Sequence, residues 1–388
     1  MSRVASILGL LIALAAAAGA ALIVSPAPTR MLALLAILAG ERSLLIIAAA
    51  LLASILAFLG SRPGTRLTSF FAIVLSLGAI VLALVPPAQA LRVASEQRVD
   101  LSFGRYLRAA IDSQGPIKAE RTATYATVGG RALGLDIYVP RGGTPAPAPA
   151  VLVVHGGGWS SGDRGDSSRF SEMLAQHGYV VFDVEYRTSP QPNGQAATGD
   201  VKCAIGWVKA HAASADWQVD PKRITLLGRS AGGHLALLAA YTPGDPKLPP
   251  SCDAPDTTVE SVIDYYGPTD LVWGYEHPGN PNVYDGRNRI EKLTGGTPST
   301  QAALYHELSP IERITPQSPR TLLIHGGRDQ FVAKAHAEMM SDKLRAAEVP
   351  FDFLLIPYAQ HGFDFIFGGF SEQIAEAIAL RFLEHKPR

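Results

Sequence analysis

The stretch TLLGRSAGGHLALLAA, Thr225–Ala240, sets a glycine-flanked serine between a short apolar run and a longer run rich in alanine and leucine. The first run is typical of a buried strand and the second of a helix. The G-x-S-x-G spacing around Ser230 fits a sharp strand-to-helix turn, where small neighbours let the serine adopt a strained backbone and project above a sheet. A plain glycine turn fits the same letters, so the rest of the chain must decide between the two.

Segments on both sides of this turn alternate between strand-like and helix-like patterns. Short apolar runs such as VLVV, VVFDV, RTLLIHG and FDFLLIP are separated by segments with helical spacing, such as FSEMLAQHGY, GDVKCAIGWVKAHAA and SEQIAEAIALRFLEH. This alternation predicts a doubly wound α/β fold, in which a mostly parallel sheet has crossover helices on both faces. An antiparallel hairpin around Gly129–Gly130 is expected at one edge of the sheet.

Four motifs follow four of the predicted strands. They are GRSAG with Ser230, HGGGW beginning at His155, HGGRD with Asp329 and AQHGF with His361. In open sheets of this type ligands bind outside the carboxyl ends of the strands, so the motifs are expected to converge on one site. The order serine, aspartate, histidine is also the one that this fold uses for a catalytic triad. These observations favour a nucleophile elbow at Ser230 over a plain turn.

The chemistry of each residue type predicts its role. A serine hydroxyl is a poor nucleophile until a neighbouring base takes its proton, so His361 is the candidate base for Ser230. Asp329 is the candidate acid that orients the imidazole, with a helix N-cap as its alternative role and Asp364 as a weaker candidate acid. Three other histidines are expected to be structural, namely His155, which braces the glycine run, His234 and His325.

Glycine-rich backbone supplies the remaining predicted element. The N–H groups of Gly157, Gly158 and Ala231 are the candidate oxyanion hole, because residues without side chains allow a substrate oxygen to approach closely. A phosphate-binding loop is the alternative for HGGGW, but the chain lacks the G-x-x-x-x-G-K-[ST] and dinucleotide-binding patterns. No cofactor is predicted, and neither cysteine lies in a metal-ligand pattern.

The N-terminal region, residues 1–91, carries most of the chain's excess hydrophobicity. Three windows contain no charged residue, Val4–Thr29, Ser43–Ser61 and Leu67–Leu91. Each is long enough to cross a bilayer, which predicts three transmembrane helices near residues 4–25, 43–61 and 67–88. A cleaved signal peptide is the alternative for the first window. Met31–Gly40 is too short to cross alone and is expected to extend or flank the second helix.

The rest of the chain divides into a linker, residues 92–119, with a short amphipathic helix at FGRYLRAAI, and a catalytic domain, residues 120–388. Within that domain an irregular segment near 267–306 is too long for a simple connection and predicts a lid or pocket wall. Arginines flank the spans almost equally on both sides, so the positive-inside rule does not choose an orientation. Cys203 and Cys252 either pair or stay free.

The chain resembles the α/β-hydrolase fold and, within it, the hormone-sensitive-lipase-like and acetylesterase-like (BD-FAE-like) carboxylesterases, over about Thr122–Glu384. The resemblance rests, in order, on HGGGWSSGD, DVEYR, GRSAGGHLA, YYGPTDL, SPI, LLIHGGRDQFV and HGF. It implies cofactor-free ester hydrolysis, with the roles named above for Ser230, Asp329, His361, Gly157, Gly158 and Ala231. Arg229 departs from the pattern, because many relatives have an acidic residue just before the serine.

The sequence therefore predicts a membrane-anchored serine carboxylesterase or lipase. Its expected partners are a small-molecule or lipid-like ester substrate and the lipid bilayer, and a zero net charge without basic clusters gives no reason to expect nucleic acid. A serine peptidase or amidase with the same triad is the nearer alternative. A non-catalytic hydrolase-fold binding module is the more distant one, because such scaffolds normally lose a triad residue.

Overall fold

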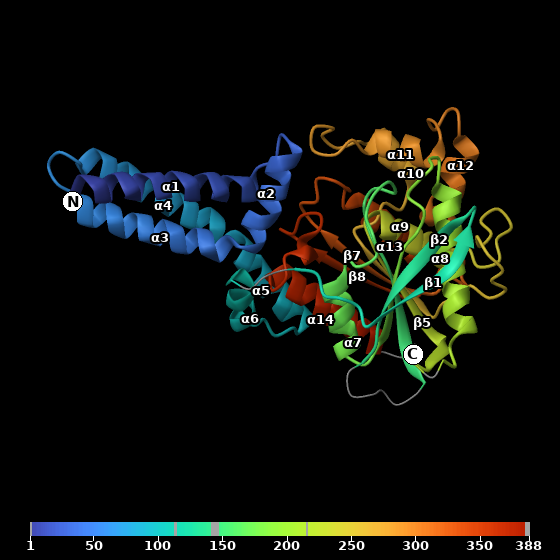
Figure 1. The fold of residues 1–388 in the computed structure, drawn as a ribbon. Coiled ribbons are helices and arrows are strands. Elements are labelled where there is room, and N and C mark those ends of the chain that lie inside the picture. The colour runs from blue at the N-terminus through green and yellow to red at the C-terminus, as the bar shows by residue number, and fades with distance from the viewer. Residues whose placement is uncertain (1, 112–114, 141–146, 215, 385–388) are drawn as a thin grey trace.

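An eight-stranded sheet forms the centre of the C-terminal part of the chain, and a bundle of helices projects from it (Figure 1). The computed structural model describes residues 2–111, 115–140, 147–214 and 216–384. Residues 112–114 of the predicted linker and 385–388 of the predicted catalytic domain lie outside the described residues.

The strands lie in the order β1-β2-β4-β3-β5-β6-β7-β8. Their bounds are β1 Arg121–Val128, β2 Arg131–Tyr138, β3 Ala148–Val154, β4 Val180–Val184, β5 Val219–Arg229, β6 Ser261–Tyr265, β7 Arg320–Gly326 and β8 Phe351–Ile356. The β1–β2 hairpin is antiparallel and lies at one edge, and the strands from β4 to β8 pair in parallel. The predicted doubly wound fold with an edge hairpin is confirmed.

Helices cover both faces of this sheet because its central strands bury apolar side chains on alternate sides. On one face, α8 (Gly194–Ala210), α9 (Ala231–Tyr241) and α13 (Ala335–Ala346) enclose one apolar core. On the other, α7 (Ser168–Gln176) and α14 (Phe370–Glu384) enclose a second. A disulfide joins Cys203 of α8 to Cys252, which settles the alternative that the sequence left open.

Three further helices stand above the carboxyl edge of the sheet (Figure 1). They are α10 (Leu271–Glu276), α11 (Gly286–Thr294) and α12 (Ala302–Glu307). About half of the segment predicted as irregular is therefore helical. Helices of six to nine residues have too few turns to show a clear period in the sequence, which explains the difference.

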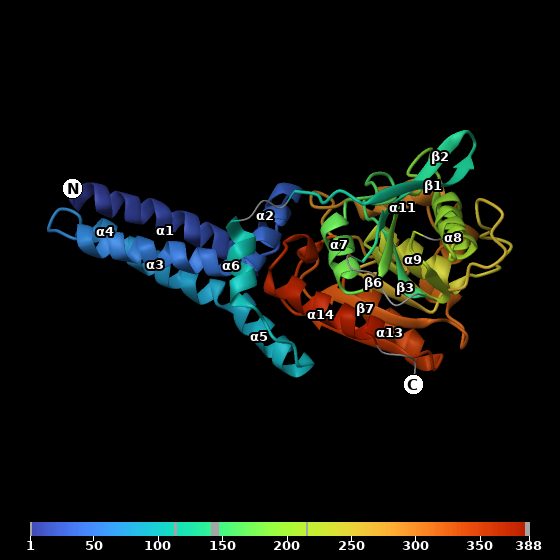
Figure 2. The same cartoon turned by 60° about the horizontal axis from the view of Figure 1, so that its bottom comes forward.

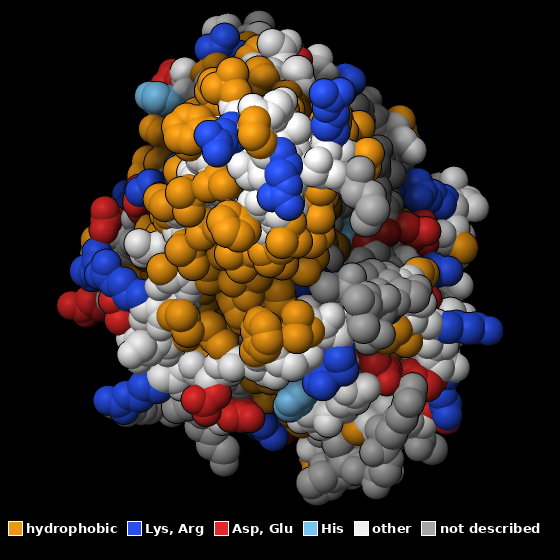
Figure 3. Space-filling view, turned by 90° about the vertical axis from the view of Figure 1, so that its left-hand side faces the viewer, with side chains coloured by type: hydrophobic (Ala, Val, Ile, Leu, Met, Phe, Trp, Pro, Cys, Tyr) orange, Lys and Arg blue, Asp and Glu red, His pale blue; other side chains and the backbone are white. Residues whose placement is uncertain are grey.

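The projecting bundle consists of α1 (Ser2–Val24), α3 (Ser43–Gly60) and α4 (Arg66–Ala83). The three helices that are long and apolar enough to cross a membrane are Ser2–Val24, Ser43–Gly60 and Arg66–Gln97, close to the three predicted spans. Alanines fill the inside of the bundle, whereas large apolar side chains point outward. Seen end-on from the tip of the bundle, the centre of the surface is largely hydrophobic, and charged side chains of both signs lie around its margin (Figure 3).

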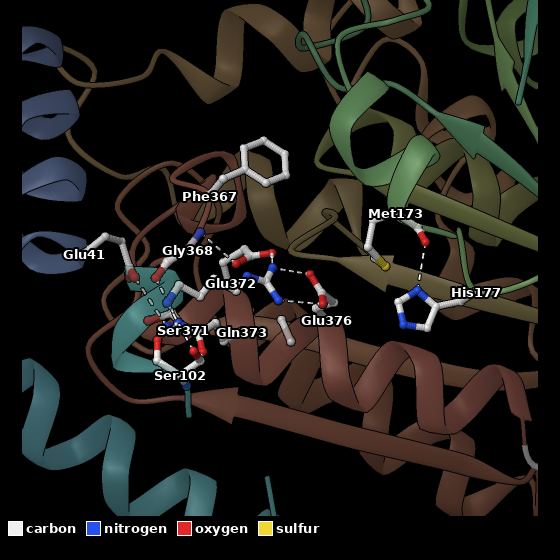
Figure 4. A network of polar contacts seen from close by, with 12 residues as sticks. Glu41, Ser102, Met173, His177, Phe367, Gly368, Ser371, Glu372, Gln373 and Glu376 are labelled. Carbon is white, nitrogen blue, oxygen red and sulfur yellow. Dashed lines mark hydrogen bonds and ion pairs between the residues drawn. The ribbon is translucent and has the colours of Figure 1, made fainter. Parts of the chain in front are cut away.

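Three shorter helices join the bundle to the sheet domain, α2 (Arg30–Glu41), α5 (Val85–Gln97) and α6 (Phe103–Ile111). Helix α5 turns away from the bundle and packs against α14, where Val93 and Ala94 belong to the second apolar core (Figure 2). Helix α2 flanks α3 rather than extending it. Its last residue, Glu41, lies at the start of α14 (Figure 4).

Candidate active site

Ser230 lies at the turn between β5 and α9, with φ 54° and ψ −120°, a conformation that non-glycine residues rarely adopt. The turn is possible because two glycines flank it. A Cβ on Gly228 would collide with the carbonyl oxygen of Gly232, and a Cβ on Gly232 with that of Val154 on the neighbouring strand. The Ser230 N–H donates to the Tyr265 carbonyl at 2.8 Å, which anchors the turn to β6.

His361 and Asp329 meet Ser230 from two loops at the same edge of the sheet. The imidazole Nε2 of His361 is 3.0 Å from the Ser230 Oγ, and its Nδ1 is 2.7 Å from Oδ2 of Asp329. A carboxylate only accepts hydrogen bonds, so Nδ1 donates to Asp329 and Nε2 is left to accept from the serine hydroxyl. The three residues predicted from sequence therefore form one hydrogen-bonded series.

Asp329 is held by its own loop. Its other oxygen, Oδ1, accepts from the backbone N–H groups of Phe331 at 2.8 Å and Val332 at 2.9 Å. Its side chain is fully buried, whereas that of His361 is 15% exposed. Asp329 therefore closes a turn within its own loop while it contacts the imidazole. It is not the helix N-cap given as its alternative role, because the next helix, α13, begins at Ala335 with Lys334 at its N-cap.

The glycine run after β3 borders the same space as Ser230. Gly157 and Gly158 have φ angles of 114° and 58° and line a cavity of about 810 Å³ together with Ser230 and His361. Within the described part of the chain, no group accepts a hydrogen bond from the N–H of Gly157, Gly158 or Ala231. These three N–H groups therefore remain available to a ligand oxygen.

The three histidines predicted to be structural have structural contacts. His155 hydrogen-bonds the Gly156 carbonyl at 2.7 Å, and burial lowers the pKa of its imidazole. His234 accepts from the Trp159 indole at 3.2 Å and donates to a backbone carbonyl, while burial lowers its pKa to about 4. His325 donates to the Val332 carbonyl at 3.0 Å, and its Nε2 is 3.6 Å from Oδ2 of Asp329.

Arg229 has a role that the sequence did not reveal. Its guanidinium lies behind the turn, 2% exposed, with Nε donating to Oδ2 of Asp364 at 2.5 Å and with the Phe170 ring 4.4 Å away. The other Asp364 oxygen accepts from the hydroxyl of Tyr266, whose ring centre is 4.5 Å from that of His361. Asp364, the weaker candidate for the triad acid, thus neutralises Arg229 while Asp329 contacts His361.

Two cavities meet at Ser230. The smaller, about 280 Å³, lies under the α10–α11 helices and includes Trp159, Ala231 and Trp273 in its lining. The larger, about 810 Å³, contains His361 and the glycine run and reaches α2. In the described ranges, no cluster of three or more His, Cys, Asp or Glu side chains is arranged to hold a metal ion.

Comparison with known proteins gives a consistent result. A family model described as BD-FAE matches residues 135–344, more than half of the chain. Two Mycobacterium tuberculosis proteins, the "Probable carboxylic ester hydrolase LipM" and "Esterase LipC", are each 32% identical, over 61% and 63% of this chain. The chain spans 54% and 60% of the lengths of those relatives.

A solved structure has the same fold. It belongs to a thermophilic esterase from Thermogutta terrifontis that is 26% identical, with a TM-score of 0.57 over 68% of this chain and 91% of that one. The same esterase has also been solved "phosphoramylated by tabun", at 25% identity.

Proposed function

The chain belongs to the BD-FAE family of α/β-hydrolases, and on that premise we propose that it is a membrane-anchored serine carboxylesterase whose nucleophile is Ser230. The main support is the hydrogen-bonded series from Ser230 through His361 to Asp329. The esterase names of its relatives and the trapped phosphoramylated form of a structural neighbour agree with a serine nucleophile.

In the proposed mechanism, the Ser230 Oγ attacks the ester carbonyl carbon while Nε2 of His361 takes the hydroxyl proton. The carbonyl oxygen becomes an oxyanion that accepts from the N–H groups of Gly157, Gly158 and Ala231. His361 then gives its proton to the leaving alcohol oxygen as the carbon–oxygen bond breaks. A water attacks the acyl-enzyme by the same route, which releases the carboxylic acid and restores the serine.

Substitution of the nucleophile tests this proposal. Ser230→Ala should lower kcat for p-nitrophenyl acetate by about 10⁴-fold or more, because the remaining groups have no nucleophile to activate. Ser299→Ala, in an exposed loop, is the matched control and should retain wild-type turnover. A fluorophosphonate probe should label the wild type and the control but leave Ser230→Ala unlabelled. Equal turnover or labelling of Ser230→Ala would remove Ser230 from the mechanism.

Membrane anchoring is the second part of the proposal, and the apolar bundle supports it. The disulfide further favours a catalytic domain outside the cytoplasm, because cytoplasmic thiols are kept reduced. The tip of the bundle, with the α3–α4 connection, would then face the cytoplasm.

Cysteine labelling tests this orientation, because both native cysteines are paired. Lys247→Cys, on the domain surface, should react with an impermeant maleimide in intact cells. Gly64→Cys, in the α3–α4 connection, should react only after the membrane is opened. The reverse pattern would place the catalytic domain in the cytoplasm, and recovery of the protein in the soluble fraction would contradict anchoring.

A further inference from the structure

The larger cavity at Ser230 joins the catalytic groups to the anchor region. One part of its lining consists of the glycine run, Ser230 and His361, and another comes from α2, through Leu34, Leu35 and Leu38. These three leucines are 45%, 44% and 46% exposed. Phe365, which follows His361 closely and is 43% exposed, lines the cavity beside them. Apolar side chains of α2 and Phe365 therefore border the cavity that contains Ser230, alongside the charged side chains of Arg30, Asp166, Arg229 and Arg289.

Helix α2 is fixed in this position by contacts on both sides. It packs against α1 and α3 at the base of the bundle. Its first residue, Arg30, donates through its backbone N–H to the Asn282 carbonyl at 2.9 Å. Just before it, the N–H of Ala27 donates at 2.7 Å to Gln330, the residue after Asp329. The helix that lines the cavity is therefore attached both to the apolar bundle and to the catalytic loops.

The positions of the two cavities indicate where the alcohol part and the acyl part of an ester would lie. Because His361 must protonate the leaving alcohol oxygen, the alcohol arm has to lie on the His361 side of Ser230. His361 lines the larger cavity, whereas the described lining of the smaller one contains Ser230 and Ala231 without His361. The acyl arm is therefore left to the smaller cavity, which the Trp159 and Trp273 side chains help to enclose.

We propose that the substrate is an ester of a short acyl group with a long-chain lipid alcohol, whose hydrocarbon chain lies along α2 and enters from the adjoining membrane leaflet. This inference rests on the proposed function. The α2 leucines and Phe365 offer a hydrocarbon chain apolar contacts in the same cavity as Ser230, at the base of the bundle. During the reaction the Ser230 Oγ bonds to the short acyl carbon, and the lipid alcohol leaves with the proton from His361.

Two isomeric esters distinguish the arms. Hexadecyl acetate and ethyl palmitate contain the same atoms, but the long chain is on the alcohol in the first and on the acyl group in the second. With full-length protein in detergent micelles, kcat/KM for hexadecyl acetate should exceed that for ethyl palmitate by at least about tenfold, the size of effect that a hydrophobic site can produce. Equal rates, faster cleavage of ethyl palmitate or cleavage of neither isomer would overturn the inference.

p-Nitrophenyl acetate separates this inference from the proposed function. If that small ester is hydrolysed but the isomers do not show the expected ratio, only the substrate assignment fails. If no ester is hydrolysed, the proposed function fails as well.

Substitutions in α2 test its contacts with the hydrocarbon chain. Leu34→Gln and Leu38→Gln should lower the rate ratio of hexadecyl acetate to p-nitrophenyl acetate by about tenfold, because each places an amide against the hydrocarbon chain. Met31→Gln is the matched control, since Met31 belongs to the same helix, is 66% exposed and is not in the cavity lining. It should keep the wild-type ratio. An unchanged ratio in the leucine variants, or an equal drop in the control, would exclude α2 from the binding site.

Discussion

The helical bundle and the sheet domain use apolar residues in opposite ways. In the sheet domain, large side chains such as Leu226, Ile263 and Phe182 are fully buried. In the bundle the fully buried positions are alanines such as Ala13, Ala53 and Ala72, whereas leucines and phenylalanines face outward. Water drives large apolar groups together, but lipid does not, so helices in lipid associate through close contact of small residues. This contrast agrees with the proposal that the bundle lies in a membrane while the sheet domain lies in water.

The two regions also differ in the polar groups that they bury. The bundle interior contains a hydroxyl pair, Ser6 and Ser69, whose oxygens are 3.0 Å apart. The sheet domain buries a full ion pair, Arg229 with Asp364, next to Ser230. Full charges are tolerated there because a rigid core supplies each one with a partner.

The largest expected effect in this comparison comes from breaking that ion pair. Arg229→Met leaves the Asp364 carboxylate buried and unpaired, which should lower the free energy of unfolding by about 3–5 kcal/mol. Arg229→Met combined with Asp364→Asn should recover part of the loss, because no uncompensated charge remains. Chemical unfolding followed by tryptophan fluorescence measures both.

An exposed ion pair supplies the control for this prediction. Arg345 and Asp342 are 64% and 76% exposed, so Arg345→Met should change the free energy of unfolding by no more than about 1 kcal/mol. If Arg229→Met were as mild as Arg345→Met, the buried pair would not be a determinant of the domain's stability.

The bundle should respond to added volume rather than to lost charge. A Cβ on Gly9 of α1 would lie 2.9 Å from the Ala53 carbonyl oxygen of α3, so Gly9→Ala must push the two helices apart. We expect a loss of about 1–3 kcal/mol in bundle stability. Gly78→Ala in α4 is matched in chemistry, but its Cβ would meet nothing within 4 Å. It should be neutral or stabilising by up to about 1 kcal/mol.

Thermal unfolding in detergent micelles compares the two glycine variants. Similar stabilities for Gly9→Ala and Gly78→Ala would mean that the close contact of α1 and α3 does not hold the bundle together. A loss confined to Gly9→Ala would support small-residue packing as its main determinant.

The sequence was most informative where a pattern repeats or where a motif has a fixed geometry. Alternating periods predicted the doubly wound sheet, and uncharged windows predicted the three apolar helices. Ser230, Asp329 and His361 were predicted as a group because each follows a strand, and parallel strands bring their carboxyl ends to one edge. The structure brings the three together, while their catalytic roles remain a prediction for Ser230→Ala to test.

Features that depend on contacts between distant segments could not be predicted in this way. Arg229 was unusual in its motif, but the sequence does not show that a residue so far along the chain as Asp364 would neutralise it. Whether α2 lines the larger cavity depends on how that helix packs. An apolar pattern of twelve residues does not show this. The disulfide likewise required the Cα atoms of Cys203 and Cys252 to be 5.5 Å apart.

The junction between the two regions provides a further prediction, a pH dependence. Glu41 at the end of α2 accepts from the Ser371 N–H at 3.4 Å, at the start of α14 (Figure 4). Burial raises the pKa of its carboxyl to about 7, against the lowering influence of Ser371 and Arg42. The folded protein therefore holds a proton there that the unfolded chain releases near pH 4.5, the ordinary pKa of the group.

A raised pKa makes this contribution to stability largest below about pH 4.5, and it is lost as the pH rises towards about 7. Within that window one such proton lowers the free energy of unfolding by up to roughly 1.4 kcal/mol per pH unit. Glu41→Gln keeps a neutral side chain at every pH, so it should reduce the slope by about that amount. Burial also raises the pKa of the Glu372 carboxyl. The Glu41→Gln variant therefore keeps the part of the pH dependence that comes from Glu372.

Chemical unfolding at several pH values between about 5 and 7 tests this prediction in the wild type, Glu41→Gln and an exposed control, Asp342→Asn. The control should keep the wild-type slope, because Asp342 is 76% exposed in the folded protein. A wild-type slope in Glu41→Gln would show that α2 does not couple to α14 through this carboxyl. A reduced slope would identify Glu41 as a proton-dependent contact between α2, at the base of the apolar bundle, and α14 of the sheet domain.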